Sequence, residues 1–301
     1  MAADRTRAGE ASDAPVAADL PRLAFVGAGR VASALAPKLV AAGYPVTGVA
    51  SRRAASAQAL ARSLPGCAAA ASLQALAGQA DIVFLTVPDD AIAAVAASVA
   101  WPDEVAAVHC SGALGLEALT PAKRRGGFHP LQSFASPDAE LAGVSVAIEA
   151  GEPLLGALGD VARRLGCRPL RLPEGARPLY HAAGAFAHNY AVTLFAQAVR
   201  LWRELGFSED QASQALLPLA KTSLSNIERL GITPALTGPI ARGDAGTVRR
   251  HLDALAASAP DLLPVYRQLG RKSRELTQLQ PAVEAELEAV LSKPKESHAC
   301  V

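Results

Sequence analysis

The segment from Leu23 to Ala32 constrains the fold of this chain more than any other. It reads Leu-Ala-Phe-Val-Gly-Ala-Gly-Arg-Val-Ala, so a short apolar strand leads through a Gly-x-Gly-x-x-Ala turn into a helical pattern. Gly27 permits the tight turn, Gly29 lets a pyrophosphate approach the backbone, and Ala32 lets the helix lie close to the sheet. The N-terminus of that helix offers free N–H groups to phosphates.

This pattern predicts a dinucleotide site, and a tight structural turn is the simpler alternative. We expect the cofactor contacts of the turn to come from Gly27, Ala28, Gly29, Arg30 and Val31.

The second candidate strand, Pro45–Ala50, is followed by Ser51-Arg52-Arg53. A site for NAD normally has Asp or Glu here, which accepts hydrogen bonds from the ribose hydroxyls. A hydroxyl and two guanidinium groups instead suit the 2′-phosphate of NADP(H), because charge-assisted hydrogen bonds contribute about 1.5–3 kcal/mol each. The sequence therefore predicts NADP(H), held in part by Ser51, Arg52 and Arg53. Two solvated arginines at the start of a helix are the alternative.

Apolar runs alternate with helical patterns from Leu23 to about Leu172. Strands separated by helices imply βαβ units with right-handed crossovers. The expected fold class is α/β, a Rossmann-type and mostly parallel sheet followed by an all-α C-terminal domain. The candidate strands are 23–26, 45–50, 81–87, 105–110, 144–148 and 168–172, and the first two candidate helices are 30–42 and 54–63.

After Pro173 the pattern is helical throughout. One long helix is expected from Ala176 to Gly206, and Ser208-x-x-Gln211 is typical of a capping box that opens the next helix. We expect a flexible tail over 1–19, a dinucleotide-binding domain over 20–173, an all-helical substrate and dimerisation domain over 174–292, and a second flexible tail over 293–301.

Charge, cysteine content and hydropathy exclude several classes of protein. The chain has 29 Lys+Arg and 28 Asp+Glu, a balance that argues against a nucleic-acid partner. None of the four cysteines forms a Cys-x-x-Cys pair, so neither a metal site nor a disulfide scaffold is expected. The longest apolar stretch, Ala91–Trp101, is shorter than the roughly 20 residues that span a membrane. We expect a cytoplasmic protein with no membrane partner.

Two more loops follow candidate strands and are expected to border the same cleft, because ligands collect at the carboxyl ends of parallel strands. They are Thr86-Val87-Pro88-Asp89 and His109-Cys110-Ser111-Gly112. We expect Val87, Pro88 and Ser111 to contact the cofactor, with ordinary strand-end turns as the alternative.

Four motifs of the chain occur together: Gly27-x-Gly-x-x-Ala32, His109–Ala113, Phe128–Phe134 and Leu236–Asp244. In this combination the chain resembles a bacterial family in which a Rossmann-like NADP-binding domain precedes a helical domain of unknown function. It is also similar to the wider group of 6-phosphogluconate dehydrogenase-like enzymes, which includes ketopantoate reductase and pyrroline-5-carboxylate reductase. The resemblance covers about Leu20 to Leu276. It implies a reductase that places substrate between its domains and often forms a homodimer through its helices.

Reduction of a carbonyl by hydride needs a group that protonates or polarises the developing alkoxide. No tyrosine of the chain has a lysine four residues later, which excludes the Tyr-x-x-x-Lys arrangement. His181, Ala185 and Asn189 stand where ketopantoate reductases have Lys, Asn and Asn on the corresponding helix. We expect His181 to be the proton donor, with Asn189 beside it. A hydrogen-bonded core histidine is the alternative.

The remaining candidates follow that helix or lie in loops. Asn226 shares a helical stripe with Thr222, Ser225 and Arg229 and is expected to orient a substrate oxygen, and Lys221 is the second candidate for the acid. His129, Thr237 and Arg242 are expected to contact substrate. Arg242 either grips a carboxylate with two hydrogen bonds or belongs to a turn in which Asp244 caps the next helix.

Taken together, these residues predict an NADPH-dependent oxidoreductase that transfers hydride to a small carboxylated carbonyl compound. A ketopantoate-like 2-keto acid is the favoured substrate. The alternatives are a pyrroline-type cyclic imine reductase and an NADP-binding regulatory module without turnover.

Overall fold

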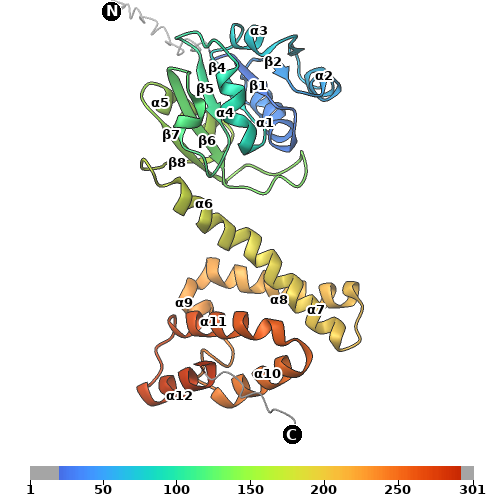
Figure 1. Ribbon diagram of the computed structural model, residues 1–301, viewed down its shortest axis with the longest axis vertical. Coiled ribbons are helices and arrows are strands. Elements are labelled where there is room, and N and C mark those ends of the chain that lie inside the picture. Colours follow the sequence, from blue (N-terminus) through green and yellow to red (C-terminus); the bar gives the residue numbers. More distant parts are fainter. Residues whose placement is uncertain (1–19, 293–301) are drawn as a thin grey trace, which may run out of the picture. The chain divides into compact units, whose positions relative to one another are not determined.

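The computed structural model describes residues 20–292, which form two compact units (Figure 1). The first unit ends at His188 and the second begins at Asn189. The two predicted tails, 1–19 and 293–301, lie outside the described residues.

The first unit is built on an eight-stranded sheet with the order β3-β2-β1-β4-β5-β6-β7-β8. Neighbouring strands are parallel except for β6 and β7, which are antiparallel, so the expected Rossmann-type, mostly parallel sheet is confirmed. The strands are β1 Leu23–Val26, β2 Val46–Ala50, β3 Ala68–Ala69, β4 Ile82–Leu85, β5 Ala106–His109, β6 Arg124–Pro130, β7 Ser145–Ala150 and β8 Arg168–Arg171.

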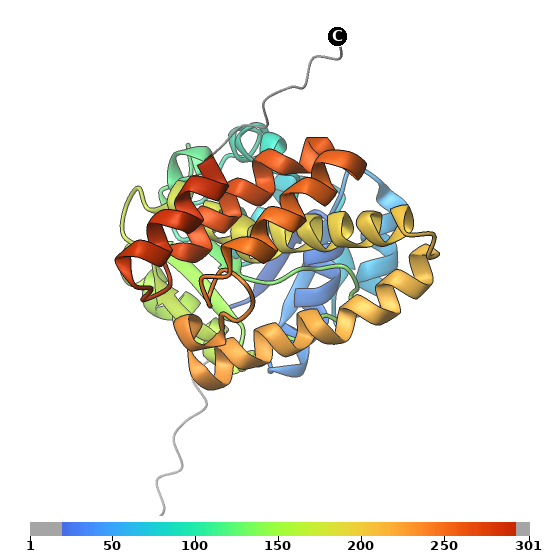
Figure 2. The same cartoon turned by 90° about the horizontal axis from the view of Figure 1, so that it is seen from below.

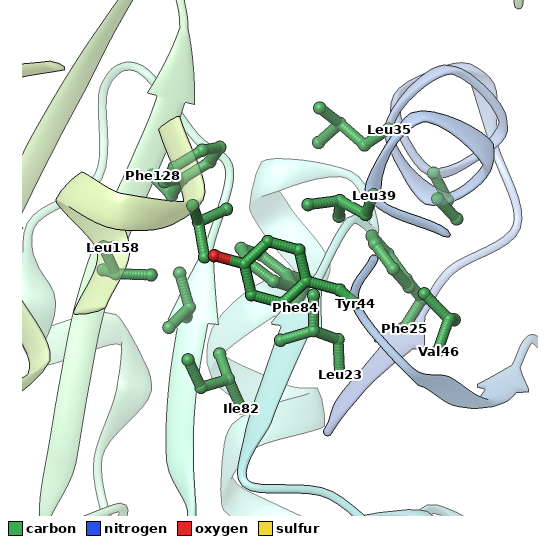
Figure 3. Close-up of a cluster of buried hydrophobic side chains, with 14 of the residues drawn as sticks. Leu23, Phe25, Leu35, Leu39, Tyr44, Val46, Ile82, Phe84, Phe128 and Leu158 are labelled. Carbon is green, nitrogen blue, oxygen red and sulfur yellow. The ribbon is translucent and has the colours of Figure 1, made fainter. Parts of the chain in front are cut away.

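Helices cover both faces of this sheet, each through its own apolar cluster. One cluster joins the sheet to α1 (Arg30–Ala41), α2 (Ala54–Arg62) and α5 (Leu154–Arg164). The other joins it to α3 (Leu73–Ala77), α4 (Asp89–Ala97) and the 3₁₀ turn η1 (Leu116–Leu119). In the first cluster the ring of Phe84 stacks on Phe25 and meets the edge of Phe128, which ties β1, β4 and β6 together (Figure 3).

Two strands of the sheet were not predicted. Phe128-His129-Pro130 was expected in a loop, but these residues end β6. The strand reads Arg-Arg-Gly-Gly-Phe-His-Pro and lacks the alternation of apolar and polar residues that marks a strand. Its two glycines interrupt that alternation, and side chains from neighbouring elements occupy the space where their own side chains would lie. The two-residue β3 is too short to leave a pattern.

The predicted long helix after Pro173 is also divided differently. It consists of α6 (Arg177–Ala185), a π-helical turn (Phe186–Tyr190) and α7 (Ala191–Glu204). The first compact unit therefore extends to His188 instead of ending at Pro173, because side chains of α6 are anchored to the sheet. Because of the wider π turn, the regular α-helical rotation of 100° per residue does not hold between His181 and Asn189.

Only helices make up the described part of the second unit. They are α7, α8 (Glu209–Leu230), α9 (Ile232–Ala235), α10 (Ala245–Ser258), the 3₁₀ turn η3 (Pro260–Leu262), α11 (Leu263–Arg274) and α12 (Pro281–Ser292). The capping box of Ser208 and Gln211 is confirmed, and Asp244 caps α10. Helices α10, α11 and α12 pack side by side (Figures 1 and 2). Between residues 20 and 292, no helix has the length and apolarity needed to cross a membrane.

Candidate active site

The carboxyl ends of β1, β2 and β4 border a groove of about 850 Å³ in the first unit. Most of the predicted cofactor residues line it, namely Gly27, Ala28, Gly29, Ser51, Arg52, Arg53, Val87 and Pro88. The other two predicted contacts of the turn, Arg30 and Val31, lie in the first turn of α1.

The two glycines of the turn fit a bound pyrophosphate for different reasons. Gly27 has φ +107°, and a Cβ there would lie 2.6 Å from the carbonyl oxygen of Thr86, so only glycine is tolerated. A Cβ on Gly29 would meet nothing within 4 Å, so this backbone faces open space. No side chain caps α1 at Gly29, which leaves the first N–H groups of the helix available to phosphate.

Arg52 and Arg53 are exposed at the end of the groove that follows β2. Neither guanidinium is ion-paired with a carboxylate in the part of the chain that the structure describes. Both are therefore available to the 2′-phosphate of a dinucleotide, next to the hydroxyl of Ser51.

Ser111 joins the loop after β5 to Asp89, the first residue of α4. Its hydroxyl donates to Asp89 at 2.7 Å and accepts from the backbone N–H groups of Ala113 and Leu114, both at 3.1 Å. These three bonds use the full hydrogen-bonding capacity of a hydroxyl. Its side chain therefore holds the 109–112 loop beside Pro88, and a cofactor contact of Ser111 would involve its backbone.

Two imidazoles converge on Gly112. A Cβ built on Gly112 would lie 2.6 Å from Nδ1 of His181 and 2.9 Å from Nε2 of His129. The ring centroids of the two histidines are 6.2 Å apart, with their planes at 72°. The absence of a side chain at Gly112 thus creates the space that β6 and α6 fill with a histidine pair. The sequence predicted a role for each histidine but not their convergence.

Tyr180 holds His129 in place. Its hydroxyl and Nδ1 of His129 share a hydrogen bond of 2.8 Å, and the two rings meet edge to face. Nε2 of His129 is left facing Gly112. No local motif marks Tyr180 in the sequence, since its partner is a histidine 51 residues away.

Burial, together with the nearby His181 and Arg177, lowers the pKa of His129 to about 4. Burial and the charge of Arg177 likewise lower the pKa of His109 to about 4. Both imidazoles are therefore neutral at pH 7.

Arg177, at the start of α6, anchors that helix to the sheet. Its side chain is 2% exposed, its Nε donates to the Glu149 carboxylate, and its Nη1 donates to the carbonyl oxygen of Ser111 at 2.9 Å. The guanidinium occupies the space that a side chain on Gly127 would need. The sequence did not reveal Arg177 or Glu149, and the two adjacent glycines of β6 are the one feature that hints at a close approach.

The other predicted site residues belong to the second unit. Lys221 and Asn226 lie on α8, and the guanidinium of Arg229 donates to Asn226 Oδ1 at 3.1 Å, as their shared stripe predicts. Asn189 lies in the π turn. Thr237 and Arg242 are exposed between α9 and α10. Their roles stay predictions.

Comparison with known protein families matches two separate segments of the chain. Residues 22–108 match a family described as NADP oxidoreductase, coenzyme F420-dependent. Residues 144–273 match a domain family of unknown function, DUF2520. Among curated proteins, no sequence match was found.

Solved structures resemble nearly the whole chain. A proposed NADP oxidoreductase from Bacteroides fragilis is 25% identical, with a TM-score of 0.71 over 85% of this chain and 99% of its own. A protein from Thermotoga maritima is 26% identical, with a TM-score of 0.70 over 84% and 97%. The 1-pyrroline-5-carboxylate reductase of Streptococcus pyogenes shares the fold at 16% identity, with a TM-score of 0.62 over 86% and 100%.

These matches confirm NADP(H) as the cofactor and indicate an NADP-dependent oxidoreductase. The more specific resemblance to 6-phosphogluconate dehydrogenase-like enzymes and to ketopantoate reductase stays a prediction.

We predict that NADPH binds at least about tenfold more tightly than NADH, because Arg52 and Arg53 pair with the 2′-phosphate. Replacing both arginines by alanine removes most of this difference, whereas Arg62→Ala, on α2 but outside the groove, leaves it intact. Fluorescence titration at moderate salt measures the affinities. Equal affinities of the unaltered protein for the two nucleotides would contradict the arginine assignment.

We predict that the ring signals of His129 do not titrate between pH 5.5 and 8, since the pKa of this imidazole lies at about 4. The chain has six histidines, so loss of one signal in His129→Asn identifies the resonance in an NMR titration. A His129 midpoint near the ordinary value of about 6.5 would show that the imidazole is not desolvated.

Proposed function

We propose that this protein is an NADPH-dependent reductase of a small carboxylated C=N compound, a cyclic imine of the pyrroline type. The observation that carries the proposal is the convergence of His129 and His181 on Gly112, directly after Ser111, whose hydroxyl donates to Asp89 beside the groove residue Pro88. Proton donors and acceptors at the carboxyl edge of the sheet lie where ligands of this fold collect.

The neutral state of His129 favours C=N over C=O. Hydride addition to a ketone produces an alkoxide that needs a proton at once, whereas a protonated imine already carries that proton and becomes a neutral amine. An imidazole with a pKa of about 4 is a poor proton source at pH 7 but a good hydrogen-bond partner for an N–H group.

Each residue then has a distinct role. NADPH supplies the hydride when it is bound. His181, which is exposed and has Nδ1 near Gly112, binds the substrate nitrogen. His129, whose ring is oriented by Tyr180, assists His181 in binding that nitrogen.

Comparison with known structures supports the imine more than the keto acid favoured by the sequence. Of the three solved structures described above, one is a 1-pyrroline-5-carboxylate reductase. Two results would replace this proposal: reduction of a 2-keto acid instead of an imine, or NADP binding without any turnover.

We predict NADPH oxidation, followed by its absorbance, with carboxylated cyclic imines and much slower oxidation with 2-keto acids, ketopantoate included. His181→Asn lowers kcat by about 10²–10⁴ and leaves NADPH affinity unchanged, because the side chain acts on the substrate. His188→Asn, in the π turn, is the matched control and keeps full activity. If only keto acids are turned over, a keto acid replaces the imine as the proposed substrate. NADPH binding without any turnover would indicate a regulatory module.

We further propose a homodimer formed through the helical unit. Of α7 and α8, only Val199 and Ala212 are buried among the described residues. The apolar side chains that these helices expose are Val192, Leu194, Leu217, Leu219, Leu224, Ile227 and Leu230. Exposed apolar surface of this extent is typical of a protein–protein interface.

Light scattering after size exclusion is expected to give twice the chain mass at about 10 µM protein, a concentration that populates a dimer of micromolar affinity. Leu224→Glu shifts the population towards monomer, because it places a charge in the apolar face. Leu170→Glu, on the edge strand β8, serves as the control. A monomeric unaltered protein at this concentration rules the homodimer out.

A further inference from the structure

A second cavity, of about 680 Å³, lies in the first unit and shares no lining residue with the dinucleotide groove. It is formed by β6, β7, the segment after β5 and the segment from the end of β8 to the start of α6. Its charged lining residues are Glu117, Arg125, Glu149, Arg171, Glu174 and Arg177.

The charges of this cavity are not fully paired. Arg177 and Glu149 bind each other, and Arg125 donates to the hydroxyl of Thr120 at 3.0 Å. Between residues 20 and 292, however, no ion pair is formed by the guanidinium groups of Arg125 and Arg171 or by the carboxylates of Glu117 and Glu174. One cavity therefore presents two guanidinium groups and two carboxylates without ionic partners.

A donor inside the protein is also unused. Nη2 of Arg177 is buried and has no hydrogen-bond partner among the described residues. This nitrogen lies against Gly127, which is not part of the cavity lining, so the rest of the Arg177 side chain is what faces the cavity. Arg177 and Pro178, the first residues of α6, line the cavity, so the positive end of the helix dipole lies there as well.

A short chain of hydrogen bonds connects this cavity to the dinucleotide groove. Arg177 donates to the backbone carbonyl of Ser111 at 2.9 Å, and the Ser111 hydroxyl donates to Asp89 at 2.7 Å. Asp89 is the first residue of α4 and directly follows Pro88, which lines the groove. A ligand that moves the Arg177–Glu149 pair thus acts on the loop that faces the dinucleotide.

We propose that this cavity binds a free α-amino acid and that its occupancy changes the affinity of the groove for NADPH. The carboxylate of the ligand pairs with Arg125 and Arg171, and its ammonium group pairs with Glu117 and Glu174. A zwitterion satisfies unpaired groups of both signs at once, whereas a ligand with a single charge leaves the opposite pair unmatched.

The first test is calorimetric titration of the full chain with each of the proteinogenic L-amino acids, with phosphate, acetate and methylamine as single-charge probes. At least one amino acid is expected to bind, and the single-charge probes are not. Arg171→Gln and Glu174→Gln weaken that binding at least about tenfold, which corresponds to loss of one charge-assisted contact. Arg168→Gln, also on β8 but outside the cavity, is the matched control.

The variant His181→Asn distinguishes binding in the second cavity from binding in the proposed active site. The variant still binds the amino acid if the ligand occupies the second cavity, and it loses this binding if the ligand occupies the active site as a substrate or product analogue. No saturable binding by any amino acid up to about 10 mM, or equal binding of phosphate or acetate, overturns the proposal whether or not the protein reduces imines.

The second test measures NADPH affinity with and without a saturating amount of the bound amino acid. The dissociation constant of NADPH is expected to change at least about fivefold, and by reciprocity NADPH changes the affinity for the amino acid by the same factor. Ser111→Ala, which cuts the bond to Asp89, reduces the effect to less than about twofold while amino-acid binding persists. An unchanged NADPH affinity in the unaltered protein overturns the coupling.

Discussion

The anchoring of α6 by Arg177 is the interaction on which the candidate site depends. A guanidinium that is 2% exposed loses its hydration, and the Glu149 carboxylate and the carbonyl of Ser111 replace it. Three and four residues further along the same helix are Tyr180 and His181, so one anchored side chain sets the position of both. Loss of Arg177 would also leave the carboxylate of Glu149 poorly solvated, which is costly inside a protein.

Glycines make this arrangement possible by the space they leave. Gly127 leaves room for the guanidinium, and Gly112 leaves room for the two imidazoles. A strand with adjacent glycines is intrinsically weak, and here the packing of α5 and α6 side chains against it compensates. The site thus depends on the space left by these glycines as much as on its polar side chains.

Features set by local interactions were predictable from the sequence. The strand–turn–helix at Gly27, the strand rich in β-branched and aromatic residues before Thr86, and the helix caps at Ser208 and Asp244 all depend on residues a few positions apart. Features that depend on distant partners were missed or placed wrongly. His129 meets a tyrosine 51 residues away, and Arg177 meets a glutamate 28 residues away. The end of the first unit and the strand character of β6 follow from these long-range contacts, so no local pattern reveals them.

A crystal structure of the full chain with NADPH tests the central claim most directly. The account predicts the 2′-phosphate between Arg52 and Arg53, the pyrophosphate at the N-terminus of α1, and the nicotinamide ring against the Gly112 loop with its reactive face towards His129 and His181. A nicotinamide that points into solvent, or a dinucleotide bound outside the groove at Gly27 and Gly29, would contradict it.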